Sequence, residues 1–171
     1  MKWLIVSDNH KDKYVVGDLV AIYKDKVDAF IHCGDTEMSA SDMVWQDYLV
    51  VQGNNDFDKK FPMEVVEQLG DYTVFIAHGH TFGVRQTLSD LIEKAKEAGA
   101  TFAFFGHTHV PTIEKVDGVW VINPGSINKP RQADHTKSYM ILTLHEDASF
   151  TAEYYDDNHQ PIPNQKYEYD I

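Results

Sequence analysis

Short apolar segments of this chain repeatedly end at a glycine or at a polar side chain of the kind that binds metal ions. This holds for the segments KWLIVS, DAFIH and YLVV, which lead to Asp8, to Asp35 and to Asn54. Short apolar runs that are rich in β-branched residues and bounded by turn residues predict buried strands. In open α/β sheets, sites form beyond the carboxyl ends of strands. Side chains that are far apart in the sequence are therefore expected to converge on one site.

Strands alternate with helical patterns in the first part of the chain, which indicates βαβ units. Apolar residues recur with helical spacing over 13–25 and again over 87–98, so we expect a helix in each range. The polar stretch from Asp157 to Ile171 is expected to be a surface tail or a final arm. The expected strands are 2–7, 28–32, 48–51, 63–68, 72–77, 101–105, 112–116, 119–122, 138–144 and 149–155.

Length and composition fit a single domain over residues 1–171. The 171 residues, of which 43% are hydrophobic, suffice for a core. The net charge of −12 makes binding along an extended nucleic acid unexpected, because proteins that follow a nucleic-acid backbone usually carry a basic face. A small phosphorylated substrate is compatible with this charge, since bound metal ions supply local positive charge.

The sequence also predicts the cellular compartment of the protein. No segment has the ~18 consecutive apolar residues that a membrane-spanning helix needs. The first ten residues, MKWLIVSDNH, lack the long apolar region and the small-residue cleavage site of a signal peptide. Cys33 is the only cysteine, so an internal disulfide is excluded, as is usual in a reducing cytosol. We therefore expect a cytoplasmic protein without a membrane segment.

Seven side chains in five short motifs are candidate metal ligands. They are Asp8 and His10 in SDNH, Asp35 in CGDT, Asn54 in GNND, His78 in AHGH, and His107 and His109 in GHTH. Oxygen and imidazole ligands without a thiolate suit a hydrolytic pair of divalent ions. Each motif alone also fits a turn, a cap or a surface residue, so the combination carries the prediction. A carboxylate has two oxygens that can join two ions, which makes Asp35 the expected bridging ligand.

The motif order SDNH, CGDT, GNND, AHGH and GHTH, followed by NPGS, resembles that of the calcineurin-like metallophosphoesterases. The short form of the chain is similar to the YfcE-type phosphodiesterases of bacteria and archaea, over roughly residues 1–155. The resemblance implies an α/β fold, a four-layer α/β/β/α sandwich of two mixed sheets. It also implies two divalent metal ions per chain, with manganese favoured and nickel, iron or zinc as alternatives.

The resemblance further implies how the ligands are shared. Asp8, His10, Asp35 and His109 would hold the first ion, and Asp35, Asn54, His78 and His107 would hold the second. Two ions that share a carboxylate lie ~3.5–4 Å apart and lower the pKa of a bridging water toward ~7. The implied function is hydrolysis of a small phosphodiester by a metal-bridging hydroxide, without a covalent intermediate. The alternatives are a phosphomonoesterase with the same dinuclear site and a non-catalytic scaffold like the retromer subunit of this fold.

Asn55 departs from the superfamily pattern, in which the residue after the ligand asparagine is often a histidine that assists catalysis. An amide can donate a hydrogen bond to a phosphoryl oxygen, but it cannot deliver a proton near neutral pH. Asn55 is therefore a candidate catalytic residue without an acid function, and alkyl esters are expected to react slowly. Arg131 is a second candidate, because its planar guanidinium could clamp a phosphate oxygen. A surface ion pair is the alternative for Arg131.

Several further residues leave two interpretations open. Asp56 either orients a metal ligand or occupies a turn. The tyrosines of the C-terminal region form either a homodimer surface or part of the monomer's own core; they are Tyr154, Tyr155, Tyr167 and Tyr169. Among the remaining histidines, structural or supporting roles are expected for His32 and His80, and exposed positions for His135, His145 and His159.

Overall fold

Two mixed β-sheets pack face to face in the computed structural model, which describes residues 1–171. The first sheet contains β1 (Lys2–Val6), β2 (Ala29–His32), β3 (Tyr48–Val50), β9 (Tyr139–Leu144), β10 (Ser149–Tyr155) and β11 (Pro161–Asp170). The second contains β4 (Glu64–Leu69), β5 (Tyr72–Ala77), β6 (Phe102–Phe104), β7 (Thr112–Val116) and β8 (Val119–Asn123). Their strand orders are β11-β10-β9-β1-β2-β3 and β4-β5-β6-β8-β7.

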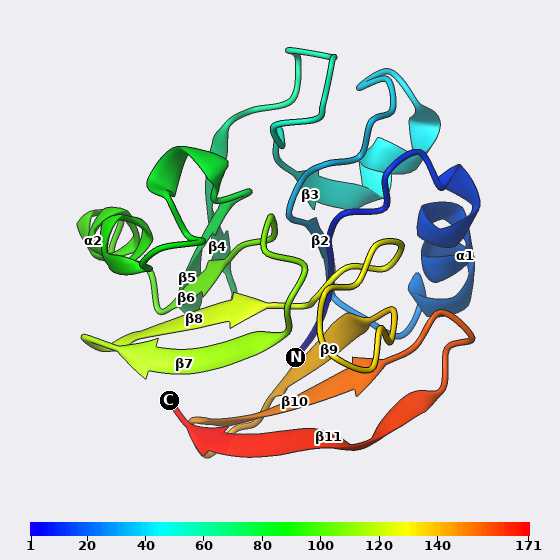
Figure 1. The fold of residues 1–171 in the computed structure, drawn as a ribbon. Helices are drawn as coiled ribbons and strands as arrows, with labels where there is room; N and C mark the ends of the chain where they lie inside the picture. Colours follow the sequence, from blue (N-terminus) through cyan, green and yellow to red (C-terminus); the bar gives the residue numbers. More distant parts are fainter.

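The helices α1 (Lys13–Tyr23) and α2 (Ser89–Glu97) lie on opposite outer flanks of the paired sheets (Figure 1). Two short 3₁₀ helices, Met43–Asp47 and His80–Phe82, lie in the connections. The layer order is thus helix, sheet, sheet, helix, which confirms the four-layer sandwich of two mixed sheets. Neither α-helix has the length and apolarity that crossing a bilayer requires.

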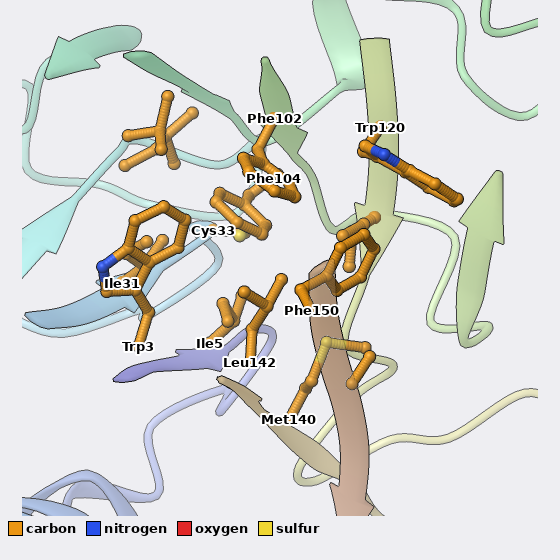
Figure 2. Packing of buried hydrophobic residues seen from close by; sticks show 14 of the residues in the cluster. Trp3, Ile5, Ile31, Cys33, Phe102, Phe104, Trp120, Met140, Leu142 and Phe150 are labelled. Atoms are coloured by element: carbon orange, nitrogen blue, oxygen red, sulfur yellow. The ribbon is translucent and has the colours of Figure 1, made fainter. Parts of the chain in front are cut away.

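The segment KWLIVS is apolar throughout because β1 is buried on both faces. Trp3 and Ile5 point into the core between the sheets, whereas Leu4 and Val6 point toward α1. This alternation is the two-residue period of a strand. In the central core the ring of Trp3 meets that of Phe102 edge to face, with centroids 5.5 Å apart (Figure 2).

The second outer layer follows from the apolar stripe of α2. Leu91, Ile92 and Ala95 of this helix are buried against the outer face of the second sheet. The helix spans Ser89–Glu97 rather than the expected 87–98. Gly99, with φ of +69°, adopts the left-handed conformation that commonly ends a helix.

The final stretch of the chain forms an edge strand, so the surface-tail interpretation was wrong. β11 pairs antiparallel with β10, placing Tyr169 opposite Phe150. Tyr169 also packs on Trp120, with ring centroids 4.7 Å apart. These contacts place Tyr169 against the monomer's own core, in which Tyr154 is buried, whereas Tyr167 is exposed. Pro161 is compatible with this strand because an edge strand tolerates a missing backbone donor.

The strand directions decide where a site can form. β1, β2 and β3 run parallel to one another in the first sheet. β5, β6 and β8 do so in the second. The antiparallel strands are added at the sides, so neither sheet is largely parallel as a whole. The connections that follow the parallel strands carry all seven candidate ligands.

Candidate metal centre

The seven candidate ligands are brought together from five connections at the carboxyl ends of strands. Asp8 and His10 follow β1, Asp35 follows β2, Asn54 follows β3, His78 follows β5, and His107 and His109 follow β6. Both sheets thus contribute to one place. That these side chains bind metal ions stays a prediction, but their convergence agrees with what the motifs predict.

The backbone at these positions is unusual. Left-handed φ angles occur at Asp8 (57°), His10 (42°), Asp35 (56°), His107 (64°) and His109 (61°). This conformation costs a non-glycine residue on the order of 1–2 kcal/mol. It persists where the surrounding structure imposes it, which is most often at functional sites. Here it turns successive polar side chains of a loop toward the same point.

The first group consists of Asp8, His10, Asp35 and His109. All four residues are buried, and one potential ligand atom of each lies within 4.8 Å of those of the others. Nε2 of His10 is 3.8 Å from Oδ1 of Asp8 and 4.0 Å from Oδ2 of Asp35. Nε2 of His109 is 2.9 Å from the same Asp8 oxygen.

This group has the donor set and the charge that a divalent cation needs. Nδ1 of His109 donates to the backbone oxygen of Lys129 at 2.6 Å, which leaves a lone pair on Nε2 of the neutral ring. That lone pair faces Oδ1 of Asp8, a buried oxygen that accepts no hydrogen bond of good geometry. Two acceptors 2.9 Å apart require a cation, either a second proton or a metal ion.

Two further candidate-ligand imidazoles, those of His78 and His10, have the same nitrogen hydrogen-bonded. Nδ1 of His78 donates to the backbone oxygen of Cys33 at 2.7 Å, and Nδ1 of His10 donates to Glu37 Oε2 at 2.8 Å. Ligating histidines almost always carry such a hydrogen bond on the nitrogen that faces away from the metal. In all three rings, Nε2 is the nitrogen that points into the centre.

The second group is Asp35, Asn54, His78 and His107. Oδ1 of Asn54 lies 3.1 Å from Nε2 of His78 and 2.9 Å from Nδ1 of His107. Oδ2 of Asp35 lies 3.4 Å from Nε2 of His78 and 4.0 Å from Nε2 of His10. The Asp35 carboxylate therefore stands between the two groups. Asn54 is exposed and His107 is half-buried, so this side of the centre is open to a substrate.

The protonation states suit metal binding in most of the centre. Burial would raise the pKa of Asp8, but His78 and other neighbours outweigh it and hold that pKa below its ordinary value. The pKa of Asp35 is likewise held well below its usual range, with His78 the main lowering influence against burial. Burial and then His78 lower the pKa of His107 to about 4, so this ring is neutral near pH 7. Ionised carboxylates and neutral imidazoles are the forms that ligate metals.

The pKa of His78 is shifted in the opposite direction to that of His107. Burial lowers its pKa, but Asp8 and Asp35 outweigh burial and raise the pKa above its ordinary value. The raised pKa favours protonation of the ring, so a metal ion at Nε2 would compete with a proton. Proton release on metal binding is expected for such a site.

Asp56 holds the loops that carry the ligands together. Its carboxylate accepts from the backbone nitrogens of Asp35 (3.0 Å), Gly53 (2.7 Å) and Glu37 (2.6 Å), and from Oγ1 of Thr36 (2.8 Å). It thus ties the loop after β2 to the loop after β3. These contacts agree with the interpretation that Asp56 orients a candidate ligand. The residue that it positions is Asp35, through its backbone, rather than an imidazole.

The NPGS motif and the nearby Asn128 donate hydrogen bonds to the backbone of the loops that carry the candidate ligands. Nδ2 of Asn123 donates to the backbone oxygen of Gly106 at 2.8 Å, and Oγ of Ser126 donates to that of Asp8 at 3.0 Å. Nδ2 of Asn128 reaches the backbone oxygen of His10 at 3.3 Å. These bonds fix the loops after β1 and β6 relative to each other.

Asn55 is exposed and contacts the central carboxylate. Its backbone nitrogen donates to Oδ1 of Asp35 at 2.8 Å, and its side-chain Nδ2 donates to Oδ2 at 2.7 Å. Arg131 is also exposed, and it contacts the site through its backbone nitrogen, which donates to the oxygen of His109 at 3.2 Å. Roles of Asn55 and Arg131 toward a substrate stay predictions.

Two residues beside the centre were missed from the sequence. Glu37 contacts His10, and its spacing of two residues from Asp35 repeats that of Asp8 and His10, which was an available signal. Arg85 reaches the backbone oxygen of His107 with Nη2 at 3.4 Å. It lies outside every motif, so nothing in the sequence pointed to it.

The other histidines mostly lie as expected. His32 is fully buried in a structural position, and His80 lies beside the second group, its ring centroid 5.5 Å from that of His78. His135 and His145 are exposed. His159 is half-buried rather than exposed, because Nδ1 of its ring hydrogen-bonds to Tyr139 Oη at 3.2 Å.

Fold and site together define a class of α/β/β/α proteins with a polar metal-type centre at the ends of the strands. The family model described as the calcineurin-like phosphoesterase superfamily domain matches residues 1–147. The chain belongs to this family, and it is a metal-dependent phosphoester hydrolase.

Several known proteins are similar to the chain over most of its length. The probable metallophosphoesterase YsnB of Bacillus subtilis is 39% identical over 156 residues, covering 91% of each chain. Phosphodiesterase MJ0936 of Methanocaldococcus jannaschii is 30% identical over 145 residues, covering 73% of this chain and 83% of that protein. The crystal structure of a predicted phosphoesterase from Streptococcus pneumoniae TIGR4 superposes with a TM-score of 0.95 at 30% identity, covering 99% and 97% of the chains.

A more distant structure shares the fold alone. Vps29 of Entamoeba histolytica, crystallised with Zn²⁺, superposes with a TM-score of 0.71 at 17% identity and covers 100% of this chain and 98% of its own. At this identity the likeness says nothing about activity.

Proposed function

We propose that the protein is a phosphodiesterase that hydrolyses small phosphodiesters at a dinuclear divalent-metal centre. The observation that carries the proposal is the position of Asp35. Its Oδ2 atom lies 4.0 Å from Nε2 of His10 and 3.4 Å from Nε2 of His78, one imidazole from each group. A single carboxylate between two imidazole groups is the arrangement that two ions sharing one ligand require.

The proposal assigns the ligands as two sets that share Asp35. Asp8, His10, Asp35 and His109 would hold one ion, and Asp35, Asn54, His78 and His107 the other. When bound, such a pair of ions acidifies a water molecule to a pKa of ~7 and polarises the phosphoryl oxygens. Manganese is the favoured ion, because oxygen and imidazole ligands without a thiolate accept it; nickel, iron and zinc suit the same set.

The residues of the open side would handle the substrate. Asn55 is exposed, and its amide can donate to a phosphoryl oxygen when it is not bonded to Asp35. Arg85, at the backbone of His107, adds a positive charge beside the second group. Arg131 is a further candidate for a phosphate contact. A diester brings one negative charge and two substituents, which an open centre accommodates.

The preference for a diester over a monoester is supported by a relative rather than by a contact in this structure. MJ0936, 30% identical, is named a phosphodiesterase. A phosphomonoesterase with the same dinuclear site is the alternative. The scaffold alternative is weakened by the complete ligand set, since all seven positions carry a competent side chain.

A panel of metals and substrates tests the proposal. Chelator-treated protein is dialysed into Mn²⁺, Ni²⁺, Fe²⁺ or Zn²⁺ and assayed with bis(p-nitrophenyl) phosphate and with p-nitrophenyl phosphate. The proposal predicts faster hydrolysis of the diester, with Mn²⁺ among the best ions. Faster hydrolysis of the monoester would favour the phosphatase. Two bound ions and no hydrolysis of either ester would favour the scaffold.

The remaining parts of the proposal concern the whole chain. We propose one domain over residues 1–171, because strands from both ends of the chain, β1 and β11, belong to the same sheet. The cytoplasm is the proposed compartment, in keeping with the single buried thiol of Cys33. A homodimer needs a surface other than Tyr154 and Tyr169, which the monomer already uses in its own packing.

A further inference from the structure

Three candidate-ligand imidazoles have their Nδ1 atom hydrogen-bonded away from the centre, and their partners are not all of one kind. His78 and His109 donate to backbone oxygens, those of Cys33 and Lys129. His10 instead donates to a carboxylate, Oε2 of Glu37, at 2.8 Å. A hydrogen bond to an ionised group is roughly twice as strong as a neutral one, and a carboxylate partner makes the ring a more basic ligand.

Glu37 is built into the loop rather than free on the surface. Its backbone nitrogen donates to Oδ1 of Asp56 at 2.6 Å, and its φ angle is +53°. Its side chain is 19% exposed, and Oε1 lies 3.6 Å from Nζ of the exposed Lys11. The loop therefore adopts a strained backbone conformation at Glu37, and this conformation places the carboxylate next to Nδ1 of His10.

The two halves of the centre differ in burial as well. Asp8, His10 and His109 of the first group are buried, whereas Asn54 of the second group is exposed and His107 is half-buried. The first group has the Asp8 carboxylate in addition to the shared Asp35, whereas the second group has only the shared Asp35, and Glu37 adds a further negative charge beside His10. A cation is held more strongly by more negative charge in a site with less water.

We propose that Glu37 is a positioning residue that fixes His10 and makes the first group the tighter of the two metal positions. This inference rests on the proposed dinuclear centre and deepens it. In this account the ion held by Asp8, His10, Asp35 and His109 is bound first and released last. The ion at Asn54 and His107 exchanges more readily.

Metal titration of the chelator-treated protein tests the inference directly. Calorimetric titration with Mn²⁺ is run on the wild type, Glu37→Gln, Glu37→Ala and Glu146→Gln. Glu146 is an exposed glutamate in the turn between β9 and β10, at the opposite end of the first sheet, so it controls for loss of a negative charge. Glu37→Gln keeps the size of the side chain and a hydrogen-bond acceptor, and thermal unfolding in chelator shows whether each variant is folded.

We expect two Mn²⁺ ions of unequal affinity in the wild type and in Glu146→Gln. In Glu37→Ala the tighter ion should bind ~10–100-fold more weakly, which is the usual effect of losing such a partner, while the weaker ion is little changed. The affinity of Glu37→Gln for the tighter ion should lie between that of the wild type and that of Glu37→Ala. Wild-type affinity for the first ion in Glu37→Ala would overturn the inference, as would equal weakening of both ions or equal affinities in the wild type.

The controls separate this inference from the proposed function. A wild type that binds two ions and hydrolyses the diester, while Glu37→Ala keeps the first ion at full affinity, overturns the role of Glu37 alone. A wild type that takes up no divalent ion overturns both.

Discussion

The Nε2 atoms of His10 and His109 lie 3.4 Å apart, although 99 positions separate the two residues in the chain. Each ring has its Nδ1 atom committed to another partner, Glu37 or the backbone of Lys129. The two Nε2 atoms are therefore presented to the same point, beside the buried Oδ1 atom of Asp8. Such convergence of lone pairs is unfavourable unless a cation occupies that point.

Close packing around this point makes one glycine sensitive to a single methyl group. A Cβ atom at Gly106 would clash with Oγ of Ser7 and lie 2.7 Å from Oδ2 of Asp8. Overpacking of this kind typically costs about 1–3 kcal/mol. We expect Gly106→Ala to lower the free energy of unfolding by that amount and to weaken Mn²⁺ binding. Chemical denaturation and metal titration measure the two effects.

Gly17 provides the matched control for that substitution. It lies within α1, and a Cβ atom there would meet nothing within 4 Å. Gly17→Ala should therefore stabilise the protein by roughly 0.5–1 kcal/mol, because alanine favours a helix over glycine. If Gly106→Ala matched Gly17→Ala in stability and metal binding, the loop after β6 would not be packed against Asp8 as described.

The absence of an acid at position 55 predicts a steep dependence on the leaving group. Asn55 cannot protonate a departing alkoxide, and proton transfer by a positioned acid is typically worth ~10²–10⁴-fold. We expect aryl diesters to react far faster than alkyl diesters in the wild type. Asn55→His should raise the rate on alkyl diesters at least ~10-fold, which is less than the full ~10²–10⁴-fold because the new side chain is not positioned by the protein for proton transfer. Steady-state rates across a series of leaving groups measure both effects.

Asn55→Gln is the control for the histidine variant, since it keeps an amide and has no proton to give. Equal rates across leaving groups of widely different pKa would show that protonation does not limit the wild type. A gain in Asn55→Gln as large as that in Asn55→His would assign the effect to shape rather than to acid catalysis.

His32 predicts how stability depends on pH. Burial lowers the pKa of this ring to about 3 in the folded protein, whereas an unfolded histidine has a pKa of ~6.5. Between these values the unfolded chain binds one more proton at this residue than the folded chain does. Stability is therefore unaffected by His32 above pH ~6.5 and falls as the pH decreases below it, by at most ~1.4 kcal/mol per pH unit.

Unfolding free energies of His32→Gln in chelator, measured between pH 7 and pH 4, check this expectation. The variant should show a shallower loss of stability toward low pH than the wild type. His145→Gln, at an exposed position, should keep the wild-type slope. An unchanged slope in His32→Gln would mean that His32 is protonated in the folded protein as readily as in the unfolded chain.

Much of this architecture was predictable because strong local patterns coincide with burial. The run around Trp3 and Leu4 is apolar on both faces, so a buried strand was the direct reading of its sequence. β11 was harder to predict, because an edge strand leaves polar side chains such as Lys166 at the surface and tolerates prolines. Tyr169 of this strand packs on Trp120 of the other sheet, a contact between distant residues that no local pattern encodes.

The same distinction applies to the site. The candidate ligands, from Asp8 to His109, have side chains of the metal-binding type and stand in recognisable motifs at strand ends, so their convergence was predictable. The contact of Glu37 with His10 was not predicted, since it depends on a left-handed backbone conformation at Glu37. The position of Arg85 depends likewise on how the loop after β5 folds against His107.

Asp35→Asn tests the central claim most directly, because Asp35 stands between the two groups. The measurement is the Mn²⁺ content at saturation together with hydrolysis of bis(p-nitrophenyl) phosphate, for the variant and the wild type. A neutral amide cannot bridge two ions as a carboxylate does. We therefore predict two ions and activity in the wild type, and fewer than two ions in Asp35→Asn. Activity of Asp35→Asn should fall at least ~10³-fold, which corresponds to a loss of ~4 kcal/mol in transition-state stabilisation. Two ions and full activity in Asp35→Asn would contradict a centre shared through this carboxylate.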